Sequence, residues 1–269
     1  NLVTYLEGLV ARAYLRIYGA REGAATAFFR FFGRHFPALV RELRWGVALS
    51  LALLMLGIAA GYALTLDDLD RYSSLVPAEI AQGRTPTSPP EELLAVLKEG
   101  EEIGGDRLAA FASFLFTHNS RVGMLCFALG PAAGAPVVLL LFGNGLMLGA
   151  MAAVYRVHDL GLEFWAWVLP HGVTELLAIG LCGGAGLALG RAVVLPGRYG
   201  RLHELAREGQ RAAAIVAGAV AMFLVAALLE GFFRQLVSGE APRYAVAVAT
   251  GAFWWWYFLR PEGDRRPGR

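Results

Sequence analysis

Two ionisable residues lie one helical turn apart inside a long apolar segment of this chain. They are His171 and Glu175, in the stretch Leu169–Gly180. An imidazole and a carboxylate on one helix face can share a proton, bind a polar solute or hold a metal ion, and within hydrocarbon each needs a partner. The identity of these partners therefore decides what the segment does.

Other polar residues interrupt the remaining apolar segments. One patch, Thr117–Arg121, lies in the middle of such a segment, and Gly143 and Gly145 flank a lone amide in the next. Glycines on both sides of an amide indicate close backbone approach or a local break. Glu230 lies near the end of a further apolar segment, 211–233. The candidate intramembrane polar cluster is His118, Asn119, Arg121, Asn144, His171, Glu175 and Glu230.

Three interpretations of this cluster stay open at the sequence level. It can hold the helices together, with Arg121 and Glu175 as the charge pair, because an unpaired charge in hydrocarbon is costly. It can line a polar cavity in which His171 and Glu175 take protons or contact a solute. A metal site from His118, His171 and Glu175 is the weakest option, because the spacing is not that of a metalloprotease helix. We therefore expect no metal, no cofactor and no enzymatic activity.

Composition places the chain among membrane proteins. Of its 269 residues 57% are hydrophobic and 17% are charged, and the mean hydropathy is +0.50. An ordinary soluble domain has about 25% charged residues. The net charge of +2 gives no reason to expect binding to nucleic acid.

Apolar runs predict an all-α bundle of about six transmembrane helices, preceded by amphipathic interfacial helices. The run 45–66 has no charge and is long enough to cross about 30 Å of hydrocarbon. Residues 107–156 allow two spans, or one that begins after the polar patch. The predicted spans are 45–66, 107–130, 136–156, 163–190, 211–233 and 243–259.

Charge asymmetry decides between these alternatives. Residues 1–44 hold seven arginines and three glutamates, whereas the loop 67–106 is acidic. Two spans in 107–156 place the arginine-rich loop 191–211 and the basic tail 261–269 on the same side as the N-terminus. The positive-inside rule therefore favours six spans, a bundle over 45–260, an external acidic loop and cytoplasmic termini.

The segments around the spans carry further expectations. Residues 1–19 and 22–43 have helical apolar spacing with interspersed arginines, so they lie on an anionic membrane surface or pack on the protein. The acidic loop contains one short helix over 90–99, and Pro170 gives the long fourth span a reason to kink. Small residues let helix backbones approach and make a homodimer reasonable. The predicted packing positions are Gly145, Gly149, Gly180, Gly183, Gly184 and Gly186.

In order along the chain, several motifs resemble the stage II sporulation protein M family over about residues 1–260. No motif is specific alone, but their ordered combination is. The matching positions are His118-Asn119-x-Arg121, Phe127-x-x-Gly130, Asn144-Gly145-x-x-x-Gly149, Pro170-His171-Gly172-x-x-Glu175, Gly190-Arg191, Pro196-Gly197-Arg198 and Glu230-Gly231.

This resemblance implies a multi-pass protein of the bacterial inner membrane. The family's namesake works with stage II sporulation proteins D and P, a machine that degrades peptidoglycan during engulfment. The implied function is a membrane scaffold for envelope or peptidoglycan-remodelling machinery, with the lipid bilayer and other envelope membrane proteins as partners. The alternative is a transporter or channel that uses the polar cluster.

Overall fold

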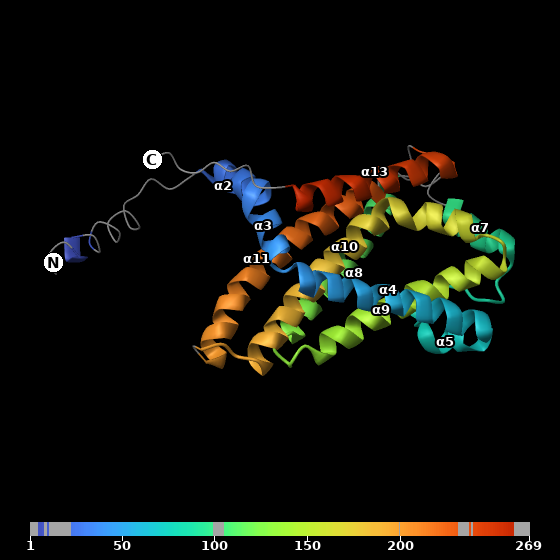
Figure 1. Ribbon diagram of the computed structural model, residues 1–269. Coiled ribbons are helices and arrows are strands. Elements are labelled where there is room, and N and C mark those ends of the chain that lie inside the picture. The colour runs from blue at the N-terminus through green and yellow to red at the C-terminus, as the bar shows by residue number, and fades with distance from the viewer. Residues whose placement is uncertain are drawn as a thin grey trace. The chain divides into compact units, whose positions relative to one another are not determined.

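Every regular element in the described part of the chain is a helix. The computed structural model describes residues 5–7, 10, 23–98, 105–198, 200–230, 237 and 239–260, without the side chains of 105–115 and 118. Two compact units form, Asn1–His35 and Phe36–Arg269. The first contains α2 (Ala24–Arg30) and the π-helical turn η1 (Phe31–His35). The second contains α3 (Phe36–Glu42), α4 (Arg44–Asp67), η2 (Leu69–Arg71), α5 (Tyr72–Leu75), α6 (Ala78–Ala81), α7 (Pro90–Lys98), α8 (Gly105–Leu129), α9 (Ala135–Val157), α10 (Gly161–Val194), α11 (Arg201–Leu228) and α13 (Glu240–Leu259) (Figure 1).

Four of these helices are long and apolar enough to cross a membrane: α4, α9, α10 and α11. Two others, α8 and α13, fall outside this set, so their crossing stays a prediction. One unbroken helix, α8, includes the polar patch Thr117–Arg121 and is followed by a turn before α9. The alternative of a helix that begins only after the patch is therefore wrong.

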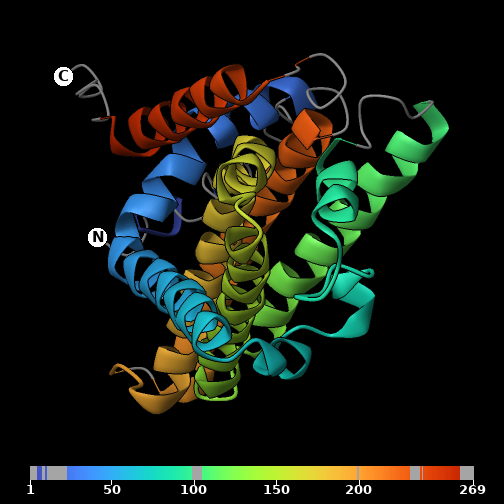
Figure 2. The same ribbon diagram turned by 90° about the vertical axis from the view of Figure 1, so that its right-hand side faces the viewer.

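Helix α10 is the centre of the bundle. It packs against α4, α8, α9, α11 and α13 (Figure 2). Its 34 residues continue through Pro170, which lies buried inside the helix. Among the four apolar helices α10 is the most buried, and its polar residues His171, Thr174 and Glu175 lie inside the bundle.

Glycines let the helices approach closely. In α4, Gly57 and Gly61 face the carbonyls of Phe142 and Leu146, and in α9 Gly149 faces the carbonyl of Ile58. A Cβ at any of these positions would collide with backbone. The atoms that face Gly145 and the α10 glycines also belong to this chain. These glycines therefore give no argument for a homodimer. Gly145 packs on Leu54, Gly180 on Leu51, Gly183 on Ser50 and Leu141, Gly184 on Val47, and Gly186 on Cys126.

Residues 67–98 form a folded cap instead of the expected loop with one short helix. The expected helix is present as α7, but η2, α5 and α6 precede it. Apolar side chains of the cap join one core with residues of α9 and α10. This core contains Tyr72, Val76, Ala81, Leu93, Leu97, Ala150, Ala152, Val154, Tyr155, Leu160, Phe164 and Val168. The sequence prediction was wrong here because polar residues outnumber these few buried ones.

Side-chain hydrogen bonds fix the segment between α6 and α7. The Tyr72 hydroxyl donates to the Arg84 carbonyl at 2.7 Å, and the Ser88 hydroxyl donates to the Gly83 carbonyl at 2.8 Å. His158, beyond α9, contacts the Pro86 carbonyl at 3.0 Å. The segment is therefore tied to the bundle.

The cap should lose stability at alkaline pH through Tyr72. Burial raises the pKa of Tyr72 from 10.0 to about 12, because the phenolate loses hydration in the cap core. A raised pKa contributes stability that is complete below pH 10.0 and disappears as pH rises to about 12. Between these values the melting temperature of the wild type should fall further than that of Tyr72→Phe. Parallel pH profiles of the two proteins would contradict this.

The second predicted amphipathic stretch, 22–43, divides between the two units. Its part in α3 packs on α4, α11 and α13, with Phe36 1% exposed. A Cβ at Gly218 would collide with the Phe36 ring. Hence α3 packs on the protein. Membrane binding by 22–35 stays a prediction. Most of the first predicted stretch, 1–19, lies outside the described residues.

Candidate functional site

Three helices bring four polar side chains together in the bundle interior. His171 Nδ1 lies 2.5 Å from Glu230 Oε2, within ion-pair distance, with both side chains almost fully buried. The side chain of Asn119 hydrogen-bonds the Glu175 carboxylate, which also interacts electrostatically with His171 and Glu230. The cluster of Asn119, His171, Glu175 and Glu230 therefore joins α8, α10 and the turn after α11. An imidazole flanked by two carboxylates can hold or release a proton.

The predicted pair of Arg121 with Glu175 is wrong. Arg121 is exposed, and no ion pair links it to Glu175 among the described side chains. The reason is helix geometry. Asn119 and Arg121 are two residues apart, a rotation of about 200° around α8, so they point to nearly opposite sides of the helix. Because Asn119 faces inward, Arg121 faces outward.

Glu230, a predicted member of the candidate cluster, lies beside His171. Its position near a helix end suggested a partner one turn later, Arg234, which lies outside the described residues. In the structure the Glu230 carboxylate forms a close ion-pair contact with His171, and its side chain is 4% exposed. The depth of a carboxylate near a helix end depends on tilt and packing, which the sequence does not give.

A cavity of about 180 Å³ reaches this cluster. Asn119, Asn144, His171 and Glu175 all line it. Apolar side chains provide most of the remaining wall, from α9 and α10: Met147, Leu148, Met151, Phe164, Trp167, Val168, Leu176 and Ile179. The cavity extends to the cap, where Ile80, Gln82 and Arg84 complete its lining. The structure therefore brings Asn144 to the same cavity as the cluster.

Arg84 is a site residue that sequence reasoning missed. It lies in the cap and is 9% exposed. Its Nε donates to the Ala81 carbonyl at 2.9 Å and its Nη2 to the Ile80 carbonyl at 2.7 Å. In the described chain no carboxylate pairs with it and its Nη1 has no hydrogen-bond partner. From the sequence it belongs only to the acidic loop 67–106, and the fold of the cap buries it.

The metal alternative cannot be built from the described side chains. The side chain of His118 is outside that set. Within it, no three histidine, cysteine, aspartate or glutamate side chains converge as metal ligands. The proposed set of His118, His171 and Glu175 therefore stays untested.

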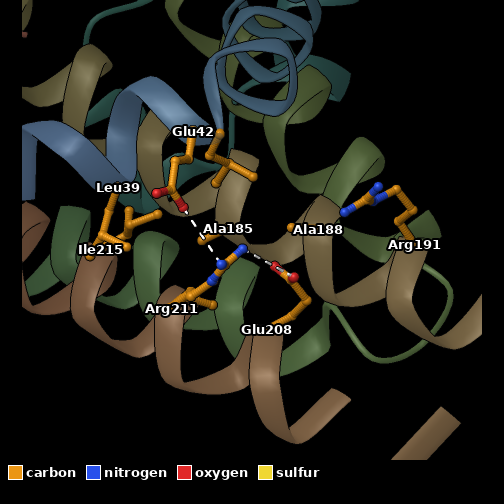
Figure 3. A pocket seen from close by; sticks show the side chains of 10 residues that line it. Leu39, Glu42, Ala185, Ala188, Arg191, Glu208, Arg211 and Ile215 are labelled. Atoms are coloured by element: carbon orange, nitrogen blue, oxygen red, sulfur yellow. Dashed lines mark ion pairs between the residues drawn. The ribbon is translucent and has the colours of Figure 1, made fainter. Parts of the chain in front are cut away.

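A second, smaller pocket lies between α3, α10 and α11. It has a volume of about 70 Å³, and Figure 3 shows Arg211 between Glu42 and Glu208, with Arg191 to one side. Arg211 lies 3.7 Å from Glu42 and 3.6 Å from Glu208. These charges neutralise one another and the Arg211 side chain is half-exposed, so the pocket is a weaker candidate for a ligand site.

Comparison with known proteins identifies a matching family. A family model described as "Stage II sporulation protein M" matches residues 50–234. This range includes the cap, the cavity and all four members of the buried cluster. Searches of curated proteins and of solved structures found no match.

Proposed function

This chain belongs to the stage II sporulation protein M family, and from that premise we propose that it is a membrane scaffold for proteins that remodel the cell envelope. The family and the four apolar helices make it an integral membrane protein. In the proposed topology α8 and α13 also cross the bacterial inner membrane, so that both termini are cytoplasmic and the cap is external.

The exposed charge of the cap carries this proposal. All six carboxylates of the described cap are exposed: Asp67, Asp68, Asp70, Glu79, Glu91 and Glu92. Arg71 pairs with Asp67 at 2.9 Å and with Asp68 at 3.4 Å, and buried Arg84 does not reach this surface. Since the cap is packed on the bundle, it presents these charges in fixed positions. Such a surface suits a partner with a basic binding face.

Removing the charge of the cap should release the partner. We expect an envelope protein to co-purify with the wild-type chain from membranes, and to be lost when all six carboxylates are changed to Asn or Gln. The same complex should weaken as salt rises, because surface charges are screened beyond about 8 Å at physiological ionic strength.

The matched control exchanges each Asp for Glu and each Glu for Asp, which preserves charge and should preserve the complex. A partner that stays bound to the neutralised cap would contradict the proposal, as would the lack of any partner on the wild type.

A second candidate function is transport of a small polar solute. It is favoured by the cavity that reaches Asn119, His171 and Glu175, because a bundle needed only as a scaffold has no reason to keep open space beside buried ionisable groups. In this case His171, between Glu175 and Glu230, would take up the proton that accompanies the solute.

A further inference from the structure

We propose that the cavity beneath the cap binds an elongated zwitterion of dipeptide size, with its carboxylate at Arg84 and its ammonium group at Glu175. This inference goes beyond the scaffold function and does not depend on it. Three observations carry it: the unsatisfied polar groups in the lining, the opposite charges of Arg84 and Glu175 and the size of the space.

The lining contains three polar groups with capacity for further hydrogen bonds. Among the described residues, Arg84 Nη1 and the Asn144 side-chain amide have no hydrogen-bond partner, while Glu175 accepts from Asn119 and has further lone pairs. A guanidinium recognises a carboxylate, a carboxylate recognises an ammonium group, and a side-chain amide matches both polar groups of a peptide bond. Together these groups are complementary to a peptide with free ends.

Arg84 is held in place before any ligand arrives. Two carbonyls at the end of α6 accept from its guanidinium, and the Tyr72 hydroxyl holds its own carbonyl. Its remaining nitrogen therefore needs no rearrangement to bind an anion. A fixed donor loses little conformational entropy on binding, which favours affinity.

The two charged groups face the same cavity. Its lining runs from Arg84 in the cap to Glu175 on α10, so one ligand can reach both. A zwitterion carries a carboxylate and an ammonium group, which match the guanidinium and the carboxylate of the lining.

The size and polarity of the cavity agree with this ligand. One water-sized probe needs about 10–15 Å³, so 180 Å³ holds about a dozen non-hydrogen atoms, the size of a small dipeptide. Met147, Met151, Trp167 and Leu176 are partly exposed in its wall, which gives apolar side chains a surface to pack on.

The test is calorimetric titration of the full chain in detergent micelles with alanyl-leucine and two blocked analogues. Because each hydrogen bond to a charged group contributes about 1.5–3 kcal/mol, alanyl-leucine should bind at least about tenfold more tightly than N-acetyl-alanyl-leucine or alanyl-leucine amide. Arg84→Gln should abolish only the preference over the amide. Glu175→Gln, which keeps the hydrogen bond with Asn119, should abolish only the preference over the acetylated peptide.

Two variants on the outer surface of the cap serve as controls. Arg71→Gln and Glu91→Gln remove charges outside the cavity and should leave all three affinities unchanged. Equal affinity for the three peptides, no saturable binding at millimolar concentration, or preferences that survive both cavity substitutions would overturn the proposal. If Arg84→Gln disturbs the cap, the blocked peptides and Glu175→Gln still decide the outcome.

Discussion

Replacing Glu230 with leucine is expected to lower the free energy of unfolding by about 3–5 kcal/mol. Glu230 Oε2 lies 2.5 Å from His171 Nδ1 in a buried ion pair, and the two side chains are 4% and 6% exposed. Without Glu230, the buried imidazole of His171 loses its partner. Neither water nor another carboxylate takes the place of Glu230, since Glu175 already accepts from Asn119. Denaturant unfolding in micelles, followed by circular dichroism, measures the loss.

A double-mutant cycle separates this pair from simple loss of packing. His171→Leu combined with Glu230→Leu should be more stable than Glu230→Leu alone, because no buried polar group is left without its partner. Arg211→Gln serves as the surface control, since its ion pairs with Glu42 and Glu208 involve a half-exposed side chain and should contribute less than about 1 kcal/mol. Strictly additive losses in the cycle would contradict a direct interaction.

Adding one methyl group at Gly149 is expected to disrupt the contact between α4 and α9. The Cβ of Gly149→Ala would overlap the Ile58 carbonyl, and backbone yields much less readily than a side chain. Overpacking of this kind costs about 1–3 kcal/mol or more, which outweighs the gain of about 1 kcal/mol in helix propensity from glycine to alanine. The melting temperature and the fraction that elutes as one sharp species in detergent should both fall.

Gly143→Ala is the matched control on the same helix. A Cβ at Gly143 meets no atom within 4 Å, so this variant should be as stable as the wild type or more stable. Equal stability of Gly143→Ala and Gly149→Ala would show that α4 and α9 do not pack at the distance described.

The sequence predicts the elements of this fold better than their contacts. The uncharged run 45–66 and the apolar segment around His171 give α4 and α10, because length and composition alone decide whether a helix can cross hydrocarbon. The spacing of His171 and Glu175 places both on one buried face. The folded cap is missed because its few apolar residues become a core only when α9 and α10 supply the other half.

Partners within the site depend on helix rotation and tilt, which the sequence does not provide. The sequence favoured Arg121 as the partner of Glu175, and only the orientation of α8 selects the amide of Asn119 instead. From the sequence, Glu230 belongs to a helix end near the membrane interface and Arg84 to an acidic loop. Both are buried because neighbouring elements close over them.

The most direct test of the scaffold function is photo-cross-linking in living cells from the surface of the cap. A photoreactive residue at Asp70 or Glu91 should form discrete adducts with an envelope protein, and these adducts should disappear when the other cap carboxylates are neutralised. The same residue at Val248, which is 71% exposed on α13, is the control for random contact. Adducts that form equally from Val248, or cap positions that yield none, would contradict the account.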